Sequence, residues 1–85
     1  MENVEKFIDT LPEKVAEYIR ANREYYAKWH ENGKTDPYDD GEVIGFIDAL
    51  HITGVIEAEH RKVLRLYMRN VYEEQVVEAY KWAIN

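Results

Sequence analysis

The sequence has no cysteine and no serine among its 85 residues. The absence of cysteine excludes disulfides, thiolate metal sites and cysteine nucleophiles. The absence of serine removes a common hydroxyl nucleophile, and the threonines form no nucleophile–base arrangement. Acid–base chemistry by Asp48 and His51, which lie one helical turn apart, is the alternative that stays open. We expect no catalytic residues and no enzyme activity.

Long hydrophobic runs are missing as well. No stretch approaches the ~20 apolar residues that a membrane-spanning helix requires. The first ten residues, MENVEKFIDT, are too polar for a secretory signal peptide. We expect a cytoplasmic protein with no membrane partner, folded as a single helical domain over residues 1–85. A chain of this length can bury a modest hydrophobic core without disulfides or metals.

Basic residues are scarce in the first two thirds of the chain. The formal net charge is −6, and all of it arises in residues 1–56, because acids and bases are equal in number in residues 57–85. Many of the acids gather around one central segment, namely Glu31, Asp36, Asp39, Asp40, Glu42 and Asp48. Such a patch repels nucleic acid and favours basic partners.

Glycine and proline are few, with 4 and 2 copies, and no segment alternates apolar and polar residues as a half-buried strand does. Apolar spacings of three and four residues predict a short helix around 4–11 and further helices at 11–31, 40–53 and 57–83. Gly54 is expected in the left-handed position after the third helix. The predicted fold class is all-α: a small irregular helical bundle with a short N-terminal helix, then three helices, the long C-terminal one being the spine.

The predicted long C-terminal helix is apolar on two opposite sides. One face, the expected core, carries Leu64, Tyr67, Met68, Val71, Tyr72, Ala79 and Trp82. The opposite face carries Leu66, Val77, Tyr80 and Ile84. A helix that is apolar on both sides is either buried on both or docked to another chain. We predict a protein interface at the second face and a homo-oligomer, with coverage by the short first helix as the alternative.

The segment TDPYDDGEV, residues 35–43, resembles a calcium loop. With Asp36 at the first position of an EF-hand pattern, Asp40 and Gly41 fall at the fifth and sixth. The third position is Tyr38, however, and the twelfth, which must supply a bidentate carboxylate, is Ile47, so we expect no calcium site. The functional hypothesis for this segment is a docking loop for a basic partner, made of Asp36, Tyr38, Asp39 and Asp40. The alternative is a solvated loop.

The three histidines, His30, His51 and His60, lack the spacing of a zinc site. Zinc on helices requires histidine pairs at i, i+4 or a cluster of four ligands, and neither occurs in this sequence. We expect no metal and no cofactor.

The segment ALHITGVIEAEHRKVLRLY, residues 49–67, resembles a helix-turn-helix. This likeness implies a nucleic-acid-binding ridge on the second helix, formed by Arg61, Lys62, Arg65 and Arg69. Against it, His60 occupies a position that the motif fills with an aliphatic residue. Glu57 and Glu59 also crowd the helix N-terminus, which should approach phosphate. The segment is similar, too, to the hairpin turn of many small bacterial and phage helical proteins, a likeness that implies no function.

Two functions follow from these patterns. The favoured one is a small acidic protein-binding or accessory protein, including an inhibitory one, that self-associates through its C-terminal helix. The alternative is a nucleic-acid-binding protein that uses the basic ridge. The overall acidity favours the first, because a chain of net charge −6 repels the phosphate backbone.

Overall fold

The computed structural model describes residues 1–31 and 37–84, with residues 37–40 by their backbone alone. Within these ranges the chain is helical and contains no strand, which confirms the predicted all-α class. The molecule measures 35 × 26 × 20 Å along its principal axes. Its described helices are α1 (Glu2–Asp9), α2 (Glu13–Glu31), α3 (Pro37–Ile52), α4 (His60–Met68) and α5 (Glu73–Ala83).

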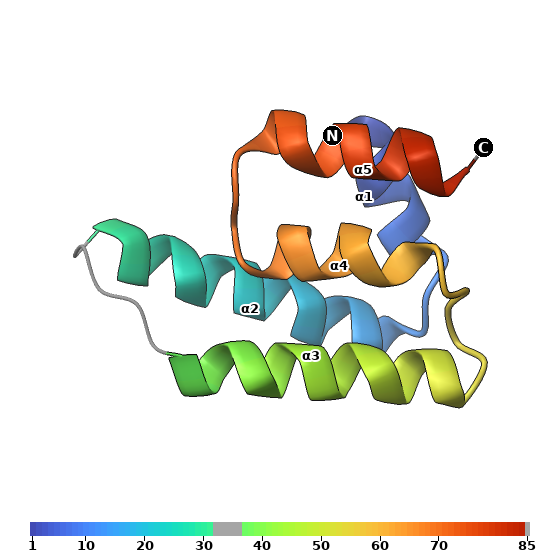
Figure 1. The fold of residues 1–85 in the computed structure, drawn as a ribbon, viewed down its shortest axis with the longest axis horizontal. Coiled ribbons are helices and arrows are strands. Elements are labelled where there is room, and N and C mark those ends of the chain that lie inside the picture. Colours follow the sequence, from blue (N-terminus) through green and yellow to red (C-terminus); the bar gives the residue numbers. More distant parts are fainter. Residues whose placement is uncertain (32–36, 85) are drawn as a thin grey trace.

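Helix α4 is the central helix of the bundle. From α2 to α5 successive helices run in alternating directions, and α4 lies between α5 on one side and α2 and α3 on the other (Figure 1). Its buried side chains, each at most 2% exposed, are Val63, Leu64, Tyr67 and Met68. Because three helices pack against α4, only one of its faces meets solvent, and that face carries its basic residues.

Every helix contributes to one hydrophobic core. The buried residues outside α4 include Val4, Ile8, Ala16, Ile19, Tyr26, Val43, Ile47, Leu50 and Val76. Most neighbouring members of this set on one helix are three or four positions apart, which places them on a single helical face. The same spacing predicted helices close to α1, α2 and α3, although three apolar-stripe residues, Tyr18, Tyr25 and Ile44, are exposed.

The predicted single helix at 57–83 is wrong, because the chain turns between α4 and α5. Asn70 has a φ of 54°, in the left-handed region. Its backbone N–H donates to the carbonyl of Tyr67 at 3.1 Å, and the N–H of Val71 donates to the carbonyl of Leu66 at 3.3 Å. This pair of bonds is a Schellman motif, which ends a helix. Asparagine fits there because it tolerates the left-handed conformation better than most residues.

The turn changes which residues of α5 face the core. Val76, outside the predicted core face, is fully buried. Tyr72 and Trp82, within the predicted core face, are 76% and 74% exposed. The predicted core face is confirmed for Leu64, Tyr67 and Met68. Beyond the turn, Val71 and Ala79 still pack against the core, whereas the prediction is wrong for Tyr72 and Trp82, because a helical wheel applies only while the backbone stays helical.

The end of α3 agrees with the sequence. Gly54 has a φ of 80°. Its N–H donates to the carbonyl of His51 at 3.1 Å, and the N–H of Val55 donates to the carbonyl of Leu50 at 2.9 Å. This is a second Schellman motif, with glycine in the left-handed position as predicted. At the other end, α3 begins at Pro37, earlier than the predicted residue 40, in keeping with the preference for proline in a first turn.

Candidate functional site

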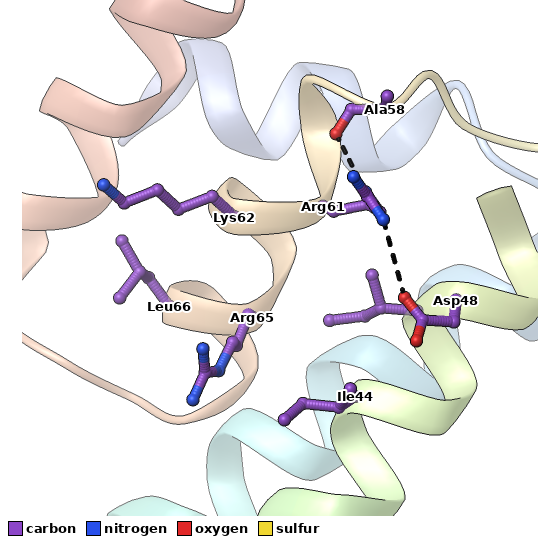
Figure 2. A pocket seen from close by; sticks show the side chains of 8 residues that line it. Ile44, Asp48, Ala58, Arg61, Lys62, Arg65 and Leu66 are labelled. Atoms are coloured by element: carbon purple, nitrogen blue, oxygen red, sulfur yellow. Dashed lines mark hydrogen bonds and ion pairs between the residues drawn. The ribbon is translucent and has the colours of Figure 1, made fainter.

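A groove of about 450 Å³ runs between α3 and α4 (Figure 2). Its described lining residues are Ile44, Ile47, Asp48, Ala58, Arg61, Lys62, Arg65 and Leu66. The first three come from α3, Ala58 from the connection and the last four from α4. On α4 the lining positions form two adjacent pairs one helical turn apart, so they share the face that its three neighbouring helices leave open.

The base of the groove is apolar. Ile47 is 3% exposed and belongs to the core, whereas Ile44, one turn earlier on α3, is 37% exposed at the edge of the groove. Leu66 packs partly against the core from the α4 side. In Figure 2 the Leu66 side chain lies between those of Lys62 and Arg65. An incoming side chain would therefore meet an apolar surface with a positive charge on either side.

The rim of the groove is mainly basic. Arg61 Nη1 lies 3.9 Å from Asp48 Oδ1, and both side chains are about half exposed, at 49% and 50%. The Nε of Arg61 also donates to the carbonyl of Ala58 at 3.3 Å (Figure 2). An ion pair this long and exposed contributes little stability. Lys62 and Arg65 are exposed on the rim as well, so the described lining residues carry three cationic side chains and one carboxylate.

Arg69, the fourth residue of the predicted basic ridge, lies outside this groove. Its guanidinium carbon stands 4.5 Å from the centre of the Tyr26 ring on α2. Its Nη1 donates to the Tyr26 hydroxyl at 3.3 Å. The Schellman turn places Arg69 at the end of α4, where it packs against α2. The structure therefore brings three of the four predicted basic residues together.

The four residues predicted as one interface are divided between two places. Leu66 lines the α3–α4 groove, whereas Val77, Tyr80 and Ile84 border a depression beside Met1 and Val4. The Tyr80 ring lies 5.9 Å from the Phe7 ring of α1. Ile84 stays 59% exposed. Helix α1 thus lies along the second apolar face of α5, and self-association through this face stays a prediction.

The predicted acidic docking loop lies outside what the structure describes. Asp36 falls between the two described ranges, and the side chains of Tyr38, Asp39 and Asp40 belong to the part given by backbone alone. Docking through this loop stays a prediction. Asp48 lines the groove, but its proposed acid–base partner His51 does not.

A polar network that the sequence did not indicate joins α1, α2 and α4. Arg20 Nη2 donates to Glu5 Oε1 at 3.0 Å and to Asp9 Oδ1 at 2.8 Å. The Tyr67 hydroxyl donates to Glu5 Oε2 at 2.8 Å. The hydrogen bond to Asp9, with help from Glu5, raises the pKa of Arg20 above its ordinary value. Burial, with the Glu5 hydrogen bond acting in the same direction, raises the pKa of Tyr67 to about 12.

The α3–α4 pair differs from a helix-turn-helix in geometry. A helix-turn-helix joins two steeply crossed helices by a turn of about three or four residues. Here residues 53–59 connect the helices, which run side by side in opposite directions (Figure 1). His60 is stacked on Phe7 of α1, with ring centres 4.2 Å apart, so it faces away from a recognition surface.

No family model, curated protein or solved structure matches the chain. In residues 1–31 and 37–84, no helix is long and apolar enough to cross a bilayer. Among the side chains that the structure describes, which exclude those of residues 37–40, no three carboxylates or imidazoles gather as metal ligands. The candidate function therefore rests on the geometry and chemistry of the groove itself.

Proposed function

We propose that this protein is a non-catalytic binding protein whose α3–α4 groove receives a segment of another protein. The observation that carries the proposal is an open groove with an apolar base, formed by Ile47 and Leu66, with the exposed Ile44 at its edge and a charged rim. Protein interfaces combine an apolar centre with a polar edge in this way. The apolar base offers a site for an anchoring side chain, and the rim supplies specificity.

The residue types in the groove favour binding over catalysis. Among the described residues that line it there is no hydroxyl, thiol or imidazole group. The carboxylate of Asp48 faces Arg61 at 3.9 Å, so its charge is partly matched within the protein. General acid–base chemistry needs a titratable group placed to exchange a proton with a substrate. Aliphatic and cationic side chains supply recognition instead.

Site-specific photo-crosslinking tests this proposal. Ala58 is an exposed residue at the groove, and Ala58→p-benzoylphenylalanine places a photoreactive ketone there. The matched control is Glu17→p-benzoylphenylalanine, on the exposed outer side of α2 and away from the groove. After irradiation of cells that express each variant, we expect a protein adduct of defined mass from the Ala58 position alone. The absence of such an adduct, or equal adducts from both positions, would reject groove binding.

A further inference from the structure

We infer that a second surface, the trough between α2 and α3, binds a proline-rich segment of a partner protein that carries an arginine or a lysine. The inference is independent of the α3–α4 groove and assigns a further binding site. Three observations carry it: the trough is lined by tyrosine rings, its exposed rings are two helical turns apart, and the charge among its described lining residues is a single carboxylate.

The trough is open because α2 and α3 lie side by side without close backbone contact (Figure 1). The described Cα atoms of the two helices stay more than 8 Å apart, and a volume of about 400 Å³ lies between them. Its described lining residues are Tyr18, Ala21, Asn22, Tyr25, Tyr26 and Glu42. The surface is therefore made mainly of flat rings with polar tips.

The two exposed rings are held in place by other rings. Tyr18 and Tyr25 are 45% and 43% exposed. The centre of the Tyr18 ring lies 4.5 Å from that of Phe46 on α3. The centre of the Tyr25 ring lies 5.5 Å from that of Tyr26 and 5.7 Å from that of Trp29. Aromatic side chains supply a large contact area at a low cost in conformational entropy, so these two rings are suited to anchor a partner.

The spacing of the exposed rings matches a polyproline II segment. Tyr18 and Tyr25 lie on one face of α2, about 10.5 Å apart along its axis. Residues i and i+3 of a polyproline II helix are ~9.3 Å apart. A Pro-x-x-Pro segment laid along α2 therefore places one proline on each tyrosine ring. Such a segment needs no sheet edge, because its backbone is solvated and its conformation is formed before binding.

The polar groups of the trough favour a basic segment. Glu42 is exposed on α3, and within the described part of the chain it forms no ion pair. An arginine or lysine beside the prolines would pair with this carboxylate and lie against a tyrosine face. The Asn22 Nδ2 donates to the carbonyl of Tyr18 at 3.0 Å. The amide oxygen of Asn22 therefore lies between the two rings, as an acceptor for an N–H between the prolines.

Two other classes of occupant fit the trough less well. Single-stranded nucleic acid also stacks on aromatic side chains, but it requires a positively charged path, and the described lining residues include no cation. An amphipathic helix packs by interdigitation of its side chains with those of the surface. The described lining residues include no leucine, isoleucine, valine or methionine to interdigitate with it.

Peptide binding measured by fluorescence anisotropy tests the inference. The probe is a labelled peptide of about ten residues, with prolines at i and i+3 flanked by arginine, which is ~31 Å long as a polyproline II helix. The comparison peptide has the same composition without that proline spacing. We expect only the first peptide to bind the intact protein. Its dissociation constant should rise about tenfold for Tyr25→Ala and stay nearly unchanged for Tyr25→Phe, which keeps the ring.

A charge exchange tests the role of the carboxylate. The dissociation constant should rise about fivefold for Glu42→Lys, and a peptide with Glu in place of its arginine should regain affinity for that variant. The matched controls are Tyr72→Ala and Glu74→Lys, at exposed residues of α5 and its N-terminus, across the bundle from α3 (Figure 1). Both controls should leave the dissociation constant unchanged. If Tyr25→Ala does not fold, as judged by circular dichroism, the charge exchange at Glu42 decides the outcome.

Four results would overturn the inference while leaving any crosslink at Ala58 standing. The first is no binding, or equal binding of the two peptides. The second is an equal loss of affinity in the variants and their controls. Binding of a neutral oligosaccharide that depends on Tyr25, when neither peptide binds, would overturn it in favour of a carbohydrate. A protein dimer dissociated by Glu42→Lys would overturn it in favour of a second copy.

Discussion

The hydroxyl of Tyr67 in the central helix α4 donates a hydrogen bond of 2.8 Å to Glu5 on α1, 62 positions earlier in the chain. The other carboxylate oxygen of Glu5 accepts a hydrogen bond from Arg20 of α2 at 3.0 Å. One side chain therefore ties three helices together. An isolated helix of 8 residues is unstable in water. Helix α1 therefore depends on such tertiary contacts and on the burial of its own side chains Val4 and Ile8.

Removal of the Tyr67 hydroxyl should weaken the attachment of α1. Tyr67→Phe keeps the ring and the Arg23 guanidinium that stacks on it at 4.5 Å, but it loses a hydrogen bond to a charged group. We expect the free energy of unfolding to fall by about 1–2 kcal/mol. The loss is no larger because the Glu5 carboxylate keeps its hydrogen bond with Arg20. Thermal unfolding followed by circular dichroism measures this loss. Tyr18→Phe, at a residue 45% exposed, is the control and should change little; equal losses would contradict the assignment.

Stability should also fall in alkaline solution. The pKa of Tyr67 is raised from 10.0 to about 12 in the folded protein. The contribution of the Tyr67 phenol to the free energy of unfolding is fully present below pH 10. Above pH 10 the phenol loses its proton in the unfolded chain before it does so in the folded protein. Rising pH therefore favours unfolding until the pH passes the pKa of the folded protein. The shift corresponds to at most roughly 2–3 kcal/mol. Urea unfolding across this range should show the gap between wild type and Tyr67→Phe closing. A gap that stays constant would show that the pKa of Tyr67 is not raised in the folded protein.

The left-handed conformation of Asn70, in the Schellman motif that ends α4, leads to a further prediction about stability. Asn70→Ala should lower the free energy of unfolding by about 1 kcal/mol, because an alanine side chain is strained at a φ of 54°. Asn70→Gly should leave it unchanged or raise it by a few tenths of a kcal/mol, since glycine has no such strain. Chemical denaturation of the three proteins gives the comparison. An alanine variant more stable than the glycine variant would mean that α4 and α5 are one continuous helix in solution, because alanine is the better helix former.

Gly54 and Gly45 offer a matched pair of substitutions with opposite expected signs. A Cβ added at either position meets no atom within 4 Å, so backbone conformation alone decides the outcome. Gly54 has a φ of 80°, and Gly54→Ala should cost about 1–2 kcal/mol. Gly45 lies inside α3, where alanine is the better helix former, and Gly45→Ala should stabilise by about 0.5–1 kcal/mol. Chemical denaturation measures both changes in the free energy of unfolding. If both substitutions stabilise or both destabilise the protein, the assignment of Gly54 as the left-handed residue that ends α3 is contradicted.

The two helix ends show what the sequence could and could not reveal. Gly54 interrupts the apolar pattern and has one common role after a helix, so the end of α3 was predictable. Asn70 performs the same role at the end of α4, but asparagine also occurs inside helices, and Val71 continues the apolar period across it. Apolar periodicity alone cannot distinguish an asparagine that ends a helix from one that lies inside a helix. The exposure of Tyr72 and Trp82 follows from that missed turn.

Only the α4 side of the groove could be predicted from the sequence. Arg61, Lys62 and Arg65 lie within two turns of one helix, so local spacing alone placed them on a common face. Ile44 joins them only because α3 packs antiparallel to α4. Such pairing depends on the geometry of the connection and on the whole core. The Glu5–Arg20–Tyr67 network lies beyond sequence reasoning for the same reason: its members are brought together by packing and share no local pattern.

The predicted self-association can be tested at the part of the second face that α1 leaves open. Val77 and Tyr80 border the depression next to α1, whereas Ile84 is 59% exposed. We expect light scattering over a concentration series to give a molar mass above the 10.1 kDa of one chain. Ile84→Glu should return it to the monomer value, because it buries a charge in the interface.

The matched control for this test is Ile52→Glu, at a residue 82% exposed on α3, which should leave association unchanged. A wild-type mass of one chain at every concentration would reject self-association. It would also mean that the second apolar face of α5 is satisfied within the molecule, with Phe7 against Tyr80 and Val4 beside Val77. In that case the second apolar face of α5 is the surface that packs against α1. The α3–α4 groove then remains a surface that we propose for binding.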